Sequence, residues 1–222
     1  MTKGKAVIIG ITGRMGTRIA REMIDRGYEI TGVNRRPERV TVRCDFPCVS
    51  AKADAGHYDE IFPVIQGAEA VIMATEPTRE HPEKYPLDVL TVMTACKAAG
   101  VRRFIVLVNF YALKSPDGRP MLVAMPEHPL FYHIECRYPE AVKLISSETK
   151  LDWLAVAAPA EMVPYAGKTG KYRTGAETII TTDPKSMVFK ETSRISMEDM
   201  AEFIAGEADN PQWHRQIVTA AY

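Results

Sequence analysis

Residues 6–16 read Ala-Val-Ile-Ile-Gly-Ile-Thr-Gly-Arg-Met-Gly, and this stretch decides the fold. Its first four residues form a continuous apolar run, which is typical of a strand buried on both faces of a parallel sheet. Gly10, Gly13 and Gly16 follow at three-residue spacing, and apolar residues then recur at helical spacing. Glycines at these places permit a tight turn, close approach of backbone to a diphosphate, and close packing of helix on sheet. Because a helix N-terminus also attracts phosphate, the stretch predicts a dinucleotide-binding loop.

The alternation of strand and helix continues outward from this loop. We expect further strands at 29–33, 48–49, 70–74, 104–108 and 153–157, and helices at 15–24, 57–66, 86–99, 139–145 and 200–206. Strands that alternate with helices indicate βαβ units. The pattern therefore predicts an α/β fold of the Rossmann type, a doubly wound parallel sheet with helices on both faces.

The second half of the chain is less regular. Residues 112–131 hold four prolines, and residues 165–195 read as short strands and turns. Ser196 and Asp199 outline a capping box before the last predicted helix. Since no repeat or linker interrupts the chain, we expect one domain over residues 1–222. Residues 112–133 and 160–195 would form a small extension on the substrate side.

Composition excludes several classes of protein. The chain has 28 Lys and Arg residues and 28 Asp and Glu residues, so its formal net charge is zero. Nucleic-acid and membrane-surface proteins usually carry a basic excess, so we expect neither kind of partner. The four cysteines lack zinc-site spacing and are too few for a disulfide framework, so we expect reduced thiols and no metal site. The first apolar run is too short for a signal peptide or membrane span, which favours a cytoplasmic location.

Several segments together resemble one family. The GxxGxxG spacing of residues 10–16 is that of extended and atypical short-chain dehydrogenase/reductases. Further landmarks of that family are similar to Asn34-Arg-Arg-Pro-Glu38, Gly67-Ala-Glu-Ala-Val-Ile72, Ala98-Ala-Gly-Val-Arg-Arg-Phe-Ile-Val106, Leu151-Asp-Trp-Leu-Ala-Val156 and Ile195-Ser-Met-Glu-Asp-Met-Ala201. The chain thus resembles the NAD(P)H-binding, NmrA-like members, and in outline the flavin and biliverdin reductases. The resemblance implies a nicotinamide dinucleotide and hydride transfer.

The residues after the second strand favour NADPH over NADH. An acidic residue there would bind the ribose hydroxyls and repel a 2′-phosphate, but this chain has Asn34-Arg35-Arg36. Guanidinium groups pair with phosphate, so we expect Arg35 and Arg36 to converge with Arg14 on the 2′-phosphate. The alternative is that the arginines only form a solvated turn. By the resemblance Asp54 accepts from the adenine amino group, and the alternative is a helix N-cap or turn residue.

We therefore expect a cofactor site that follows the carboxyl ends of the strands. Its predicted members are Gly10, Thr12, Gly13, Arg14, Met15, Gly16, Arg35, Arg36, Asp54, Ala74, Thr75 and Pro159.

The catalytic residues are less clear, because the usual pair is missing. Classical members of the superfamily carry a Ser after the fifth strand and a Tyr-x-x-x-Lys on the next helix, where Lys lowers the pKa of Tyr. Here Asn109 and Tyr111 stand at the first place. At the second, Tyr132 precedes Cys136 by four residues and His133 precedes Arg137 by four, so neither frame gives the pair.

Pro139 adds to the difficulty, since proline fits the first turn of a helix and breaks its interior. We name Asn109, Tyr111, Tyr132 and His133 as catalytic candidates. The alternative is that they are lid or core-edge residues.

The predicted function is an NADPH-dependent reductase that transfers hydride to a small planar or carbonyl/enone-type substrate. Two alternatives stay open. One is an isomerase, epimerase or cyclase that retains NADP on the same fold, and the other is a non-catalytic regulator that senses NADP(H). The expected partner is a small molecule, and the expected assembly is a monomer or small homo-oligomer.

Overall fold

The fold is built around one eight-stranded sheet. The computed structural model describes residues 2–125, 129–186 and 188–222. The strands run in the order β3-β2-β1-β4-β5-β6-β10-β8. Their bounds are β1 Lys5–Ile9, β2 Glu29–Asn34, β3 Val49–Lys52, β4 Ala68–Met73, β5 Arg103–Asn109, β6 Asp152–Ala158, β8 Arg173–Ala176 and β10 Gln216–Ala221. Neighbours pair in parallel up to β10, whereas β8 is antiparallel to β10. The predicted Rossmann-type sheet is confirmed, with one antiparallel strand at its edge.

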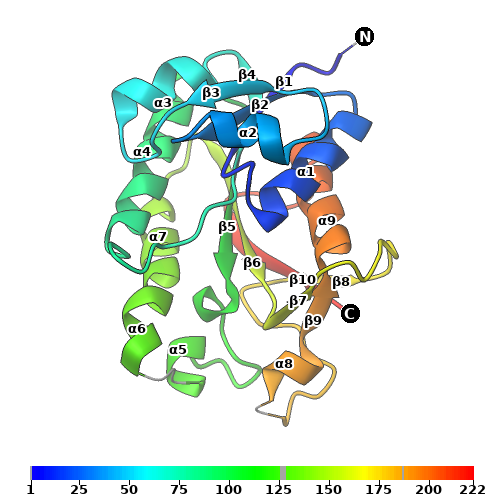
Figure 1. Ribbon diagram of the computed structural model, residues 1–222. Helices are drawn as coiled ribbons and strands as arrows, with labels where there is room; N and C mark the ends of the chain where they lie inside the picture. Colours follow the sequence, from blue (N-terminus) through cyan, green and yellow to red (C-terminus); the bar gives the residue numbers. More distant parts are fainter. Residues whose placement is uncertain (1, 126–128, 187) are drawn as a thin grey trace.

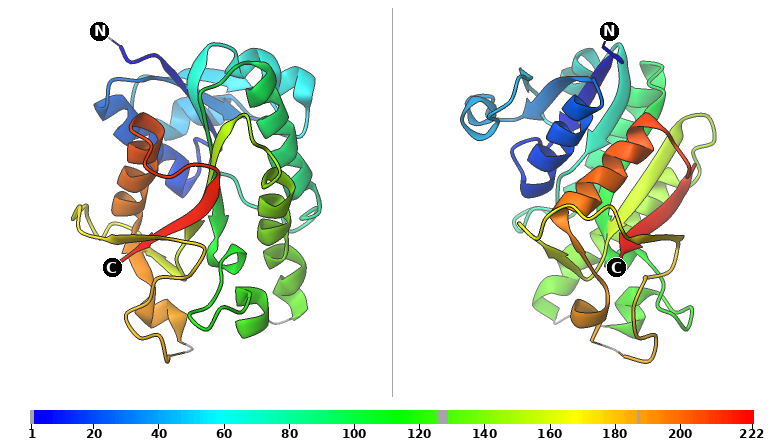
Figure 2. Two further views of the ribbon diagram at one scale, coloured as in Figure 1. Left: turned by 180° about the vertical axis from the view of Figure 1, so that it is seen from behind. Right: turned by 90° about the vertical axis from the view of Figure 1, so that its right-hand side faces the viewer.

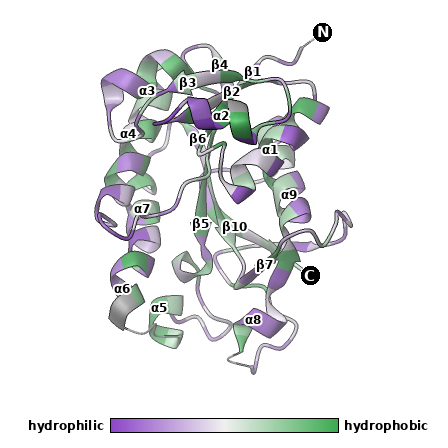
Figure 3. Ribbon diagram, in the orientation of Figure 1, coloured by the Kyte–Doolittle hydropathy of each residue, from purple (hydrophilic) through white to green (hydrophobic). Residues whose placement is uncertain are grey.

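Helices cover both faces of the sheet (Figure 1). One face packs against α1 (Arg14–Asp25), α2 (Glu38–Arg43) and α9 (Met197–Asp209). The other packs against α3 (Tyr58–Ile65), α4 (Lys84–Ala98) and α7 (Arg137–Ile145). Figure 2 shows α1 and α9 side by side on their face. Burial of strands on both faces explains their unbroken apolar runs, and the helices show alternating hydrophilic and hydrophobic residues (Figure 3).

The remaining elements gather beyond the carboxyl end of β5 (Figure 1). After the 3-10 turn η1 (Phe110–Ala112) come α5 (Met121–Ala124) and α6 (Pro129–Glu135). On the opposite side, β7 (Glu161–Val163) pairs in parallel with β9 (Arg194–Ser196), which follows α8 (Phe189–Thr192). These elements occupy the two segments that the sequence marks as a C-terminal extension and lid. Residues 126–128 and 187 of those segments lie outside the described residues.

A buried hydrogen-bond cluster fixes the start of α9. The Ser196 hydroxyl accepts from the Asp199 N–H at 3.0 Å, which confirms the predicted cap. The Asp199 carboxylate accepts from the N–H and hydroxyl of Thr169, both at 2.7 Å, and from the Tyr222 hydroxyl at 2.7 Å. Burial alone would raise the pKa of Asp199, but these donors lower it overall. The cluster ties the loop after β7 to α9.

None of the helices in the described part of the chain has the length and apolar character that crossing a bilayer requires.

Candidate functional site

The glycine loop brings three backbone segments into close contact at the end of β1. Gly10 has φ +84°, and a Cβ there would lie 2.6 Å from the carbonyl oxygen of Ala74. A Cβ on Gly16 would lie 2.2 Å from the carbonyl oxygen of Gly10. No described side chain caps the N-terminus of α1, which follows Gly13 directly. The first N–H groups of α1 therefore stay available to an anion, as the sequence predicts.

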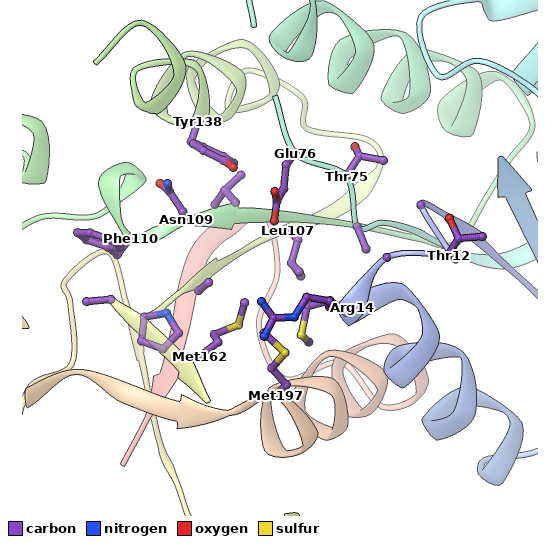
Figure 4. A pocket seen from close by; sticks show the side chains of 18 residues that line it. Thr12, Arg14, Thr75, Glu76, Leu107, Asn109, Phe110, Tyr138, Met162 and Met197 are labelled. Carbon is purple, nitrogen blue, oxygen red and sulfur yellow. The ribbon is translucent and has the colours of Figure 1, made fainter. Parts of the chain in front are cut away.

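A main cavity of about 630 Å³ opens at this loop, across the carboxyl ends of β1, β4, β5 and β6. It is lined by Gly10, Thr12, Gly13, Arg14, Met15, Ala74, Thr75, Glu76, Leu107, Val108, Asn109, Phe110, Tyr138, Ala158, Pro159, Ala160, Met162 and Met197 (Figure 4). Eight of the predicted cofactor residues thus meet in one place: Gly10, Thr12, Gly13, Arg14, Met15, Ala74, Thr75 and Pro159. Gly16 lies behind them, buried against Gly10.

Two smaller cavities extend the main one past the end of β2. The first, of about 210 Å³, shares Gly10, Thr75 and Glu76 with the main cavity and adds Arg35 and Asp54. We call it the Arg35 cavity. The second, of about 400 Å³, shares Arg35 and Asp54 with the Arg35 cavity and reaches the loop before α3. Together the three form one extended cleft along the edge of the sheet.

The hydroxyl of Thr75 is the clearest sign in the cleft of a polar group that a ligand could satisfy. Its hydroxyl oxygen is buried and has no hydrogen-bond partner in the described structure, and the residue lines both the main and the Arg35 cavities. A buried hydroxyl without a partner is costly, so a bound molecule with polar atoms would satisfy it. With the glycine loop beside it, this hydroxyl fits the ribose and phosphate portion of the expected dinucleotide.

The arginines do not converge as the sequence analysis expects. Arg14 lines the main cavity, whereas Arg35 lines the Arg35 cavity together with Arg39, the second residue of α2. Arg36 lines none of these cavities and is exposed. The reason is local: the chain turns into α2 at Pro37, and the Arg39 N–H donates to the Arg36 carbonyl at 3.0 Å. That turn brings Arg39 to the cleft, and a helical reading of residues 37–43 would have identified it.

Two carboxylates lie close together at the Arg35 end of the cleft. Asp54 accepts from the Gly56 N–H at 3.0 Å, and Asp88 of α4 lines the same two cavities. Burial, and then the charge of Asp54, raise the pKa of Asp88 to about 6, against the opposing effect of Lys84 and Arg35. Sequence reasoning missed Asp88, because its position within α4 gives no signal before the helices are packed.

Asn109 and Tyr111 have mainly local roles in this structure. The Asn109 side-chain oxygen accepts from the Tyr111 N–H at 3.0 Å, and its amide nitrogen donates to Glu135 at the end of α6. Asn109 still lines the main cavity, while Tyr111 is buried in the core behind it. The Asn109 side chain therefore anchors η1 and α6 beside the cavity.

Tyr132 and His133 do not line the main cavity. Both lie on α6 and are exposed, Tyr132 at 49% of its surface. Helix α6 ends at Glu135, and α7 starts at Arg137 with Pro139 in its first turn, as the proline predicts. Tyr132 and His133 therefore lie on a short helix separate from α7.

Tyr138 is the hydroxyl that the structure brings to the cavity instead. It stands in the first turn of α7, is 7% exposed, and packs edge-on against Tyr85 at 5.3 Å between ring centroids. Figure 4 shows its hydroxyl directed into the cavity near Glu76. Burial raises the pKa of Tyr138, and the nearby charges of Glu76 and Glu135 raise it further. The signal in the sequence was Tyr138-Pro139 itself, since Pro in a first turn fixes where the helix begins.

The chain is similar to known proteins over most of its length. The family model described as NAD(P)H-binding matches residues 10–211. A candidate epimerase from Bacteroides thetaiotaomicron is 30% identical over 98% of this chain and 96% of that chain, with a TM-score of 0.83.

Two further solved structures share the fold at lower identity. A candidate NADH-flavin reductase from Streptococcus pneumoniae is 20% identical over 98% of this chain and 99% of that one, with a TM-score of 0.78. The anaerobilin reductase ChuY from Escherichia coli is 15% identical over 98% and 96%, with a TM-score of 0.72.

Proposed function

The chain belongs to the NAD(P)H-binding family, and on that premise we propose that it is an NADPH-dependent reductase of small planar conjugated or carbonyl substrates. One observation carries the proposal: the two ends of the cleft differ in chemistry. The Arg35 cavity holds two guanidinium groups beside the carboxylates of Asp54, Glu76 and Asp88. The far end of the main cavity is lined mainly by apolar side chains, with the Arg14 guanidinium and the Tyr138 hydroxyl directed into it. Guanidinium groups suit a nucleotide phosphate, and a largely apolar end with few polar groups suits a small substrate.

The residues present fit a nicotinamide dinucleotide. We assign the diphosphate to the glycine loop and the N-terminus of α1, the 2′-phosphate to Arg35 and Arg39, and the adenine to the side of Asp54. Thr75 would gain the polar partner that it lacks. Between β2 and the end of the first turn of α2, Glu38 is the one acidic residue. It lines neither the main cavity nor the Arg35 cavity. This arrangement supports NADPH over NADH. When bound, NADPH supplies the hydride.

Tyr138 would act on the substrate as a hydrogen-bond donor. Its pKa is raised by burial and by two carboxylates, so the phenol keeps its proton across the physiological range. The phenol can therefore donate to a substrate oxygen and stabilise the charge that develops there. In classical members a lysine lowers the tyrosine pKa, and this chain has carboxylates near the tyrosine instead. Phe110, Met162 and Met197 line the same end with apolar surface.

Oxidation of NADPH against a panel of quinones, flavins, aldehydes and enones tests the proposal. We expect turnover with at least one planar acceptor, and we expect Tyr138→Phe to lower kcat about a hundredfold without changing the Kd for NADPH. Tight NADPH binding with no turnover on any acceptor would overturn it and would instead favour a regulator that senses NADP(H).

An epimerase that retains NADP is the second candidate. The similarity to the candidate epimerase from B. thetaiotaomicron favours it, and so does the presence of a carboxylate and a phenol in one cavity. The two functions differ in net redox change. A reductase consumes one NADPH per product, whereas an epimerase returns the cofactor unchanged, so stoichiometric loss of absorbance at the NADPH band decides between them.

A further inference from the structure

Arg14 is a charged residue of the cleft without a counter-charge. It is the first residue of α1, and its guanidinium makes no hydrogen bond or ion pair with the described residues. Arg18, one turn later on the same helix, pairs with Glu198 at 2.8 Å. Figure 4 shows the Arg14 guanidinium in the main cavity beside Met162 and Met197. Arg14 therefore faces the end of the cleft that holds Tyr138, away from Arg35.

Groups other than Arg14 are available to bind the phosphates of the proposed dinucleotide. Arg35 and Arg39 line the cavity past β2, and Arg14 does not line it. The glycine loop and the uncapped N-terminus of α1 provide backbone N–H groups for the diphosphate. Arg14 is exposed at the cavity, and the thioether side chains of Met162 and Met197 beside its head group offer it no counter-charge. The only acidic residue among the described residues that line the main cavity is Glu76, and no ion pair joins it to Arg14.

We propose that Arg14 binds an anionic group of the substrate, so that the protein acts on a planar conjugated molecule that carries a carboxylate or an equivalent oxyanion. This inference rests on the proposed function and narrows its substrate class. A guanidinium pairs with a carboxylate through two parallel hydrogen bonds, which fixes orientation as well as adding affinity. The flexible side chains of Met162 and Met197 adapt to the face of a ring, and Phe110 offers an aromatic surface at the same end.

This geometry would orient the substrate between two anchors. The anion would lie at Arg14 on the α1 side, and the oxygen that gains charge would lie at the Tyr138 hydroxyl on the α7 side (Figure 4). A neutral molecule of the same shape would keep only the second anchor. The cavity therefore selects by charge as well as by shape.

A matched pair of ligands tests the inference without turnover. We would titrate 2-naphthoate and 2-naphthalenemethanol into the NADP⁺ complex of the wild type, Arg14→Lys and Arg14→Met. We expect the wild type to bind the carboxylate about tenfold more tightly than the alcohol, a smaller ratio in Arg14→Lys, and no preference in Arg14→Met. The Kd for NADP⁺ should stay within about twofold in all three proteins.

Two results would overturn the inference. One is equal binding of both ligands, or no binding of the carboxylate, in the wild type. The other is a loss of about tenfold or more in the affinity of Arg14→Met for both NADP⁺ and NAD⁺, which would assign Arg14 to the cofactor diphosphate. The proposed reductase fails in a different way: the carboxylate would still bind through Arg14, but no acceptor would be reduced.

Discussion

The proposed preference for NADPH rests on Arg35 and Arg39. Both line the Arg35 cavity without a hydrogen bond or ion pair from their side chains to the described residues. We expect Arg35→Ala and Arg39→Ala each to weaken NADPH binding by roughly 1–3 kcal/mol and to leave NADH nearly unchanged. Arg43→Ala, on the exposed end of the same helix, is the control that should alter neither Kd. Equal losses for both cofactors would show that the arginines do not bind the 2′-phosphate.

We expect Asp88 to make cofactor binding depend on pH. Its carboxyl has a pKa of about 6 and faces Asp54, Lys84, Arg35 and His57. Above that pH its negative charge repels a phosphate near Arg35, and below it the repulsion disappears. Asp88→Asn should therefore bind NADPH more tightly than the wild type near pH 8, by on the order of 1 kcal/mol, and equally near pH 5.

The cofactor phosphate also titrates in this range, but it does so alike in both proteins, so the difference between them isolates Asp88. Asp59→Asn on the exposed face of α3 controls for net charge and should follow the wild type. Weaker binding by Asp88→Asn near pH 8 would contradict the expected repulsion and would indicate that the carboxylate contacts the cofactor.

Among individual site residues, the sequence predicted those that directly follow strands. Thr75 and Pro159 fall in the cleft because the carboxyl ends of parallel strands meet at one edge. The sequence did not identify Arg39, Asp88 or Tyr138, which lie on helices. Asp88 reaches the cleft only through the packing of α4, whereas the prolines that mark the starts of α2 and α7 were available signals for Arg39 and Tyr138. The roles of all of these residues stay predictions.

The contact between β1 and α1 sets the shape of the glycine loop. Gly16→Ala places a methyl group 2.2 Å from the Gly10 carbonyl oxygen, so α1 must move away from the loop. We expect this variant to lose most of its affinity for NADPH and to melt at a lower temperature. Gly206→Ala in α9 is the control, since nothing lies within 4 Å of its added Cβ. It should stabilise the protein by about 0.5–1 kcal/mol and bind NADPH normally.

A titration followed by NADPH fluorescence measures the affinity. If Gly16→Ala bound NADPH as tightly as the wild type, the close contact between α1 and the glycine loop would not be needed for binding.

Helices and strands were predicted correctly where the spacing of apolar residues and the glycines or prolines at the ends of the segment indicated the same element. Strands β1 to β6 and helices α1, α3, α4, α7 and α9 overlap their predicted ranges. Helices α2, α5, α6 and α8 were not predicted, because each is short and held by tertiary contacts rather than by an amphipathic repeat. Strand β10 was not predicted either, although Ile217-Val218 begins an apolar run of the expected kind.

A buried charge cluster around Arg103 joins β5, β6, α9 and the segment just before β10. This residue at the start of β5 is fully buried and forms ion pairs with Asp152 of β6 at 2.9 Å and Glu207 of α9 at 3.2 Å. It also donates to the Trp213 carbonyl at 2.9 Å, just before β10. Arg103→Met removes the guanidinium that both carboxylates share. Asp152 then keeps His214, and Glu207 keeps the N–H groups of residues 212 and 213, but neither carboxylate has a buried cation. We expect a loss of about 3–5 kcal/mol in the free energy of unfolding.

The neighbouring residue provides the control for that measurement. Arg102 is half exposed and contacts Glu69 at 3.6 Å on the surface, so Arg102→Met should cost about 1 kcal/mol or less. Denaturant unfolding of both variants measures the difference. Similar losses for the two would contradict the structural role of the buried cluster.

The sequence predicts the parallel core of the sheet, but it does not predict the strands β10 and β8 at one edge. Alternating strands and helices imply a parallel sheet, and the glycine loop places the ligand edge at the carboxyl ends of its strands. The addition of β10 and antiparallel β8 depends on contacts between residues far apart in the chain, such as the pairing of Val218 with Val156 and Ala176. The single domain, the small-molecule partner and the state of assembly stay predictions.

A crystal structure of the NADP⁺ complex would show where each part of the cofactor lies. We expect the nicotinamide ring to lie in the main cavity between Tyr138 and Met162, and the 2′-phosphate to contact Arg35 and Arg39. Density that places the nicotinamide ring outside the main cavity, or the 2′-phosphate in solvent away from both arginines, would contradict this expectation.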